Sequence, residues 1–131
     1  MTEIRSFSNI VNGAAKASKE TFESFNPYTG KVWAHVPNCS TQDVDEAVEA
    51  AHSAFHKSEW ATMTASARGK LLNRLADLIE KNAERLAEIE TLDNGKLIAE
   101  MGGQVRYLPE WYRYFGGLAD KIEGRVLPID K

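Results

Sequence analysis

Few side chains in this sequence have the chemistry of a nucleophile or a metal ligand. Cys39 follows Pro37-Asn38 in a segment that we expect to be a loop. A catalytic thiol needs a neighbouring base and donors for an oxyanion, and no base for Cys39 can be identified. His52 and His56 have the four-residue spacing at which two helical imidazoles can bind one zinc ion, but no third ligand accompanies them. We therefore interpret Cys39 as an incidental loop residue and both histidines as solvated side chains.

Asp93 is the carboxylate with the least ordinary position. It precedes Asn94-Gly95, which predicts the end of a helix. A carboxylate there faces the negative end of the helix dipole. One interpretation is a turn residue that bonds to its own backbone. The other is a ligand of a hard cation, which prefers a carboxylate together with carbonyl oxygens. The residue types alone leave both interpretations open.

A cluster of aromatic residues occupies the segment 107–115. Its members are Tyr107, Trp111, Tyr112, Tyr114 and Phe115. On one helix they would lie on more than one side, so the helix is either buried all round or lines a cavity. The sequence offers too little other chain to cover them. This is the strongest indication from the residues that part of the fold is missing.

Two β-prone runs predict a hairpin over about 21–36. The turn between them is Asn26-Pro27-Tyr28-Thr29-Gly30, in which proline presets one backbone angle and glycine can supply a positive φ. Residues 32–36 alternate in the period-two pattern of a strand. Residues 1–20 are small and polar, with a turn signal at Asn12-Gly13, and we expect a loop from Ala14 to Lys19.

Apolar residues at helical spacing predict about three helices, over about 41–57, 65–92 and 104–121. Ser40 or Thr41 would cap the first helix. Pro109 should kink the third helix unless it lies in the first turn. We thus predict a mainly α-helical segment with an N-terminal β-hairpin.

The composition narrows the class of protein. The chain has 131 residues, 16 basic against 19 acidic side chains, and one cysteine. The charge balance argues against nucleic-acid binding, and a single cysteine argues against a disulfide scaffold. No apolar run is long enough to span a membrane, and no export signal is visible, so we expect a cytoplasmic protein.

Six motifs occur together in a familiar order. They are FNPYTG at 25–30, DVDEAVEAA at 43–51, Trp60, RGKLLNRLADLIE at 68–80, ETLDNGK at 90–96 and RYFGGLADKIEG at 113–124. In this order the chain resembles the NAD(P)-dependent aldehyde dehydrogenase superfamily, from about Asn12 to the last residue. The resemblance implies an oxidoreductase that is α/β when complete, of which this chain is an incomplete part of the coenzyme-binding domain.

The resemblance also implies roles for particular residues. The catalytic cysteine, the glutamate base and the cofactor site lie outside this chain, so no catalytic or cofactor-binding residue is assigned here. Tyr107 and Trp111 would face the aldehyde channel. Asp93 and the carbonyl of Phe25, with Ser24 beside it, would hold a monovalent cation.

The partners implied are the remainder of the dehydrogenase chain, NAD or NADP, a small-molecule aldehyde, and further copies in a homodimer or homotetramer. Neither a nucleic acid nor a membrane is expected as a partner. The alternative is a non-catalytic, stand-alone helical interaction module or a pseudo-enzyme remnant, which would bind a partner through its aromatic surface.

Overall fold

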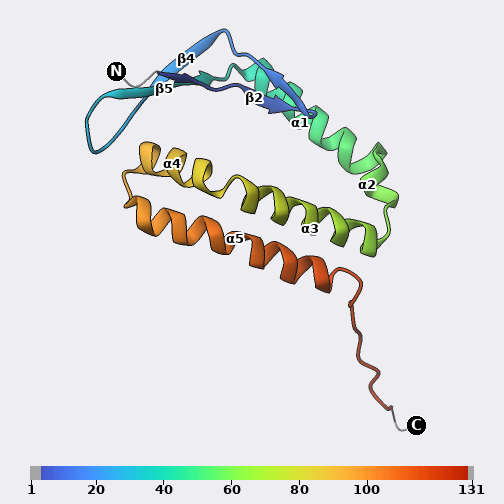
Figure 1. Cartoon of the computed structure of the whole chain (residues 1–131). Coiled ribbons are helices and arrows are strands. Elements are labelled where there is room, and N and C mark those ends of the chain that lie inside the picture. The colour runs from blue at the N-terminus through green and yellow to red at the C-terminus, as the bar shows by residue number, and fades with distance from the viewer. Residues whose placement is uncertain (1–3, 130–131) are drawn as a thin grey trace.

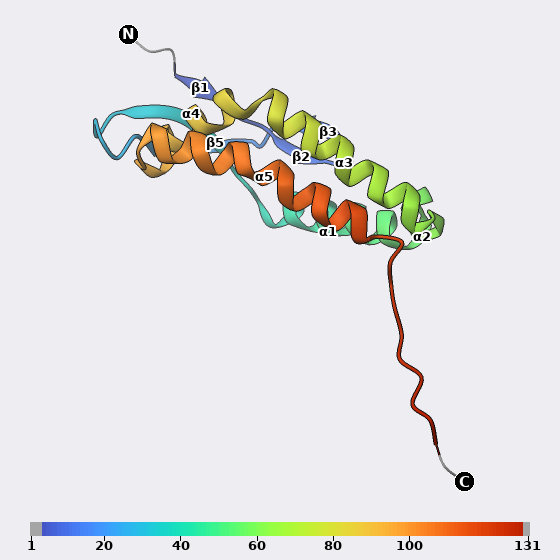
Figure 2. The same cartoon turned by 60° about the horizontal axis from the view of Figure 1, so that its bottom comes forward.

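The computed structural model describes residues 4–129, which form five strands and five helical segments. The strands are β1 (Arg5–Ser6), β2 (Asn9–Val11), β3 (Ala14–Lys16), β4 (Glu20–Phe25) and β5 (Val32–Asn38). The helices are α1 (Thr41–Lys57), α2 (Glu59–Thr62), α3 (Ala65–Lys81), α4 (Ala83–Asn94) and α5 (Ile98–Leu118). In Figure 1, α3 and α4 lie between the strands and α5. The segment after α5 extends away from the other elements (Figure 2). The prediction of a mainly helical segment with an N-terminal hairpin is confirmed.

The predicted hairpin is formed by β4 and β5, which pair antiparallel around the turn at 26–30. β1 pairs parallel to β5, so the sheet has the order β1-β5-β4. The expectation of a loop from Ala14 to Lys19 is wrong at its start, because Ala14–Lys16 form β3, which pairs with β2 in a second hairpin. Its turn residues, Asn12 and Gly13, both have positive φ, as a two-residue hairpin turn requires. These strands, of three residues each, are too short to show a strand pattern in the sequence.

Ser40, one of the two residues expected to cap the first helix, is the N-cap of α1 and forms a capping box with Asp43. The Asp43 backbone N–H donates to Ser40 Oγ, and the Ser40 backbone N–H donates to Asp43 Oδ2 at 2.8 Å. Hydrogen bonds from Ser40, and a weaker one from Ser18, lower the pKa of Asp43 below its ordinary value of 3.8. No residue of α1 is fully buried, and the cap stabilises the start of the helix.

We expect Ser40→Ala to destabilise α1 by about 1 kcal/mol, because the first-turn donors lose their acceptor. The folded pKa of Asp43 is depressed, so its stabilisation is present above the ordinary pKa and lost as the pH falls through the lowered one. The protection factors of the α1 amides, taken relative to the intrinsic exchange rate at each pH, should therefore fall on acidification in the wild-type chain. The Ser40→Ala variant should show lower protection factors already at neutral pH and a smaller acid response. An equal acid response in both would contradict the role of the cap.

The single helix predicted over 65–92 is wrong, since the chain forms α3 and α4 with a break at Asn82. The Asn82 side chain donates to the carbonyl of Leu78 at 2.8 Å, and its backbone leaves the helical region with φ −107° and ψ 13°. An asparagine that bonds to the backbone in this way competes with helix continuation. Apolar periodicity runs through the break and could not reveal it.

The helix predicted over 104–121 instead runs from Ile98 to Leu118, so Gly102-Gly103 lies inside it. Pro109 lies in the helix interior, beyond the first turn, and its side chain is completely buried. Burial of the proline ring against neighbouring side chains offsets the lost backbone hydrogen bond.

The helical layer is held together at two places. Gly69 of α3 and Gly116 of α5 lie at a close backbone approach, where a Cβ on Gly69 would come within 2.5 Å of the Gly116 carbonyl oxygen. The main cluster of buried apolar side chains joins α4 to α5 and consists of Ala83, Ala87, Met101 and Val105, with Ile79 packed against it. The helices on which the candidate site residues lie are thus positioned by backbone contact and by a small core.

Arg113 adds an ion cluster across α3 and α5. Its guanidinium contacts Asp77 at 3.0 Å, Glu80 at 2.5 Å and Glu110 at 3.1 Å. The hydrogen bonds with Glu80 and Asp77 raise the pKa of Arg113 further, so it stays charged at every accessible pH.

None of the described helices combines the length and the apolar character that a membrane span needs.

Candidate functional site

Asp93, in the last turn of α4, contacts strand β4. Ser24 Oγ donates a hydrogen bond to Asp93 Oδ1 at 2.8 Å, and Phe25 is the next residue along β4. The two elements are 69 residues apart in the sequence at this contact. The fold therefore brings Asp93 beside the strand that carries Phe25.

Asn94, not Asp93, makes the local turn bond. The Lys96 backbone N–H donates to Asn94 Oδ1 at 2.9 Å, which is the bond that the turn interpretation had assigned to the aspartate. Among the hydrogen bonds of the described residues, Asp93 uses only Oδ1, and it uses it across the fold. The interpretation of Asp93 as a turn residue is wrong, and its carboxylate is held for a tertiary contact.

The chemistry at this point suits a hard monovalent cation. The last turn of α4 carries no basic side chain, so the carboxylate of Asp93 adds to the negative end of the helix dipole. Hydroxyl and carbonyl oxygens of β4 supply neutral donors of the type such ions prefer. Across residues 4–129, no group of three or more His, Cys, Asp or Glu side chains could hold a metal ion. A cation at this point would therefore have one carboxylate and neutral oxygens as its available ligands.

The turn after α4 packs directly on the tip of the β4–β5 hairpin. Gly95 has φ 74°, and a Cβ at this position would lie 3.0 Å from Pro27 Cβ. Glycine is required here both by the left-handed backbone and by the close approach. The contact fixes the distance between Asp93 and strand β4.

We expect Gly95→Ala to lower the free energy of unfolding by about 2 kcal/mol, through backbone strain and the contact with Pro27. Gly30→Ala is the matched control, because Gly30 has φ 65° and open space around its Cα. Gly30→Ala should lower the free energy of unfolding by only about 1 kcal/mol, which is the strain of a left-handed backbone at alanine. Urea unfolding followed by circular dichroism measures both. Equal losses would show that the packing on Pro27 carries no energy.

Tyr107 and Trp111 lie one helical turn apart on α5 and contact each other edge to face, with ring centroids 5.9 Å apart. Their side chains are 58% and 52% exposed. With Lys96, Gln104 and Leu108 they line a concavity of about 380 Å³. The structure thus places the two predicted channel residues together on one open, largely apolar face.

The remaining aromatic residues are also incompletely covered. Tyr114 and Phe115 pack edge to face with a centroid separation of 5.3 Å, yet each is more than half exposed. The described residues therefore leave much of this aromatic surface uncovered, in agreement with the sequence, which offered too little other chain to cover it.

The other sequence candidates form no reactive group. Cys39 is exposed, and its thiol accepts a hydrogen bond from Asn9 Nδ2 at 3.2 Å. The rings of His52 and His56 lie 4.4 Å apart on the exposed side of α1. Within the described part of the chain, neither Cys39 nor the two histidines belong to a group of three or more side chains that could hold a metal ion.

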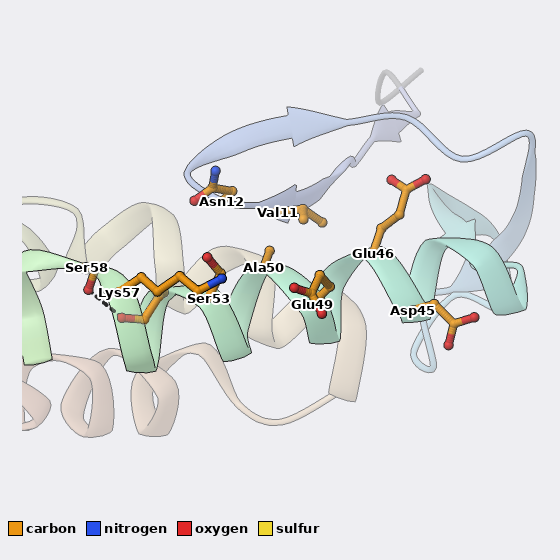
Figure 3. A pocket seen from close by; sticks show the side chains of 10 residues that line it. Val11, Asn12, Asp45, Glu46, Glu49, Ala50, Ser53, Lys57 and Ser58 are labelled. Atoms are coloured by element: carbon orange, nitrogen blue, oxygen red, sulfur yellow. Dashed lines mark hydrogen bonds between the residues drawn. The ribbon is translucent and has the colours of Figure 1, made fainter.

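The structure also shows a hollow that sequence reasoning did not identify. It lies between the β2–β3 hairpin and α1 and has a volume of about 760 Å³. Figure 3 shows Asn12 and Val11 above Ala50 and Ser53, with Lys57 at one end. Glu46, at the other end, forms an ion pair with Lys16. The hollow depends on the hairpin that the sequence did not reveal, and it joins no nucleophile to a base.

Comparison with known proteins agrees with this arrangement. The aldehyde dehydrogenase family model matches residues 14–131. A (Z)-2-((N-methylformamido)methylene)-5-hydroxybutyrolactone dehydrogenase from Acinetobacter baylyi is 50% identical over 98% of this chain, which corresponds to 26% of the relative. The mitochondrial aldehyde dehydrogenase of Sus scrofa is 50% identical over 86% of this chain and 22% of its own length.

Solved structures show the same fold. The NAD-dependent aldehyde dehydrogenase of Sinorhizobium meliloti superimposes with a TM-score of 0.89 and 31% identity, over 95% of this chain and 25% of that structure. The NAD⁺ complex of an aldehyde dehydrogenase from Bacillus cereus has a TM-score of 0.87 and 40% identity, over 97% and 26%. The chain spans about a quarter of the length of these relatives and is a partial domain. It belongs to the aldehyde dehydrogenase family.

Proposed function

We propose that this chain is the N-terminal part of an NAD(P)-dependent aldehyde dehydrogenase, which oxidises an aldehyde to a carboxylic acid through a thioester on a cysteine outside this chain. The observation that carries the proposal is the match of sequence and fold over almost the whole chain. NAD(P)⁺, when bound by the remainder of the enzyme, accepts the hydride. The residues described here bind and position, and none of them takes part in bond making.

The aromatic face of α5 would form part of the aldehyde channel. Tyr107 and Trp111 support each other edge to face, so both rings are held in place at low entropic cost. Once the remainder of the chain covers this face, such a wall excludes water from an apolar substrate.

Asp93 would hold a monovalent cation, together with the Phe25 carbonyl and the neighbouring Ser24. The support is the placement of the carboxylate beside β4, at a helix end without a basic side chain. A cation there would join α4 to the hairpin and offset the charge of Asp93 at the negative end of the helix.

The complete enzyme would be a cytoplasmic homodimer or homotetramer. The single exposed cysteine suits a reducing compartment, and the uncovered apolar side chains of this chain suit burial by further protein. Light scattering of the complete protein measures the assembly. Fractionation of the source cells measures the location.

A chimera tests the proposed function directly. This chain replaces the matched segment of the Sus scrofa enzyme, and aldehyde-dependent formation of NADH is followed by absorbance. We expect the chimera to be active and a variant that lacks the segment to be inactive, because the channel wall and the helical layer would be missing. An inactive chimera that folds and binds NAD⁺ would contradict the proposal.

The half-exposed aromatic face also suits a stand-alone interaction module. The coding sequence after Lys131 distinguishes the dehydrogenase from the interaction module. A coding sequence that continues past Lys131 with a nucleotide-binding segment supports the dehydrogenase. A stop codon directly after Lys131, with a monodisperse chain that binds no hydrophobic dye, supports the module.

A further inference from the structure

Two hydrogen bonds connect the interior of the sheet to the candidate cation ligand. Trp33 Nε1 lies 2.9 Å from Ser24 Oγ, and the same Oγ lies 2.8 Å from Asp93 Oδ1. Trp33 is on β5, Ser24 is on β4 and Asp93 is on α4, so three elements contribute to one chain of polar groups.

The chemistry of the three groups determines the direction of both bonds. An indole N–H can only donate, and an ionised carboxylate can only accept. Ser24 Oγ must therefore accept from Trp33 and donate its single proton to Asp93 Oδ1. A serine hydroxyl can ordinarily rotate among several partners, but here the indole N–H excludes orientations toward Trp33, and the Asp93 carboxylate accepts the proton on the other side.

The indole itself is held in place. Trp33 is 9% exposed, and its ring packs edge to face against Phe7 with centroids 5.7 Å apart. Its orientation is thus set by the packing of the sheet and not by the site. Rigid outer partners of this kind commonly orient the groups that bind a metal.

We infer that Trp33 and Ser24 are positioning residues for the Asp93 carboxylate. Trp33 directs the Ser24 hydroxyl to Oδ1, and this bond turns the carboxylate toward β4 with Oδ2 left for the cation. The inference rests on the cation site proposed above and adds to it Trp33, which cannot itself be a ligand because its indole has no acceptor.

The test uses the complete protein encoded by the gene, with potassium chloride titrated against choline chloride at constant ionic strength. The readout is the thermal unfolding midpoint at each potassium concentration, supported by tryptophan fluorescence. We expect potassium to stabilise the wild type, and Asp93→Asn to abolish the response. Trp33→Phe keeps the ring packing but removes the N–H, and should raise the half-saturating potassium concentration about 10-fold.

Three further variants separate positioning from general stability. Ser24→Ala should resemble Trp33→Phe, whereas Ser24→Thr keeps a hydroxyl and should restore the potassium affinity. Trp60→Phe is the matched tryptophan control, since Trp60 lies on α2 beside Arg68 and should titrate as the wild type does. A loss of stability alone lowers every midpoint without moving the half-saturating concentration.

The outcomes distinguish the two proposals. A wild type without a potassium response, or an Asp93→Asn variant that keeps it, overturns the cation site and the inference with it. A wild-type response that Asp93→Asn removes but Trp33→Phe leaves at the same half-saturating concentration overturns only the positioning role.

Discussion

Gly69→Ala is expected to destabilise the protein by about 2 kcal/mol, because the added methyl group meets the α5 backbone. Its Cβ would lie 2.5 Å from the Gly116 carbonyl oxygen and 3.2 Å from Ala119 Cβ. Neither is the end of a flexible side chain, so α3 and α5 must separate. The sign is the informative part, since glycine to alanine inside an exposed helix ordinarily stabilises by about 1 kcal/mol.

Gly103→Ala is the matched control for this prediction. Gly103 also lies inside a helix, but no heavy atom lies within 4 Å of its would-be Cβ. It should stabilise the protein by up to about 1 kcal/mol. Urea unfolding followed by far-ultraviolet circular dichroism gives both values. Two stabilising substitutions would show that the helices are not in backbone contact at Gly69.

Met101→Ala is expected to cost about 3 kcal/mol, because it empties the centre of the small α4–α5 core. Met101 is 3% exposed, and its other core partners are mostly alanines, which cannot expand into the space. The loss should appear as a lower urea midpoint with an unchanged slope. Loss of this core would also loosen the end of α4, on which Asp93 lies.

Ile98→Ala serves as the control for the methionine. Ile98 begins the same helix but is 55% exposed, so truncation removes little buried surface. Its cost should stay below about 1 kcal/mol. Comparable losses at the two positions would mean that α5 packs on α4 differently from the arrangement described.

The local features of the fold follow from neighbouring residues. The capping box at Ser40 and the left-handed stop at Gly95 were predictable because a cap depends on a few adjacent side chains. The break at Asn82 was not, since apolar spacing continues through it and the asparagine could equally have pointed to solvent. The β2–β3 hairpin carried only its turn as a signal.

The candidate site shows the same division. Asp93, Phe25, Tyr107 and Trp111 were named from the order of motifs in the sequence. That Asp93 reaches across the fold to Ser24, while Asn94 makes the turn bond, appeared only in the structure. The role of Trp33 had no signal in the sequence, because its strand pattern predicts only a residue that packs.

The sequence by itself determined the family and the mainly helical class, and it named the candidate residues of the proposed site. Motif order and local propensity depend on neighbouring residues along the chain. Both can therefore be recognised in a chain that spans about a quarter of the length of its relatives. Only the tertiary structure decided which of those residues meet. The Trp33–Ser24–Asp93 contact and the approach of Gly69 to Gly116 join elements far apart in the sequence. Such contacts depend on how whole elements pack, which no local pattern of residues records.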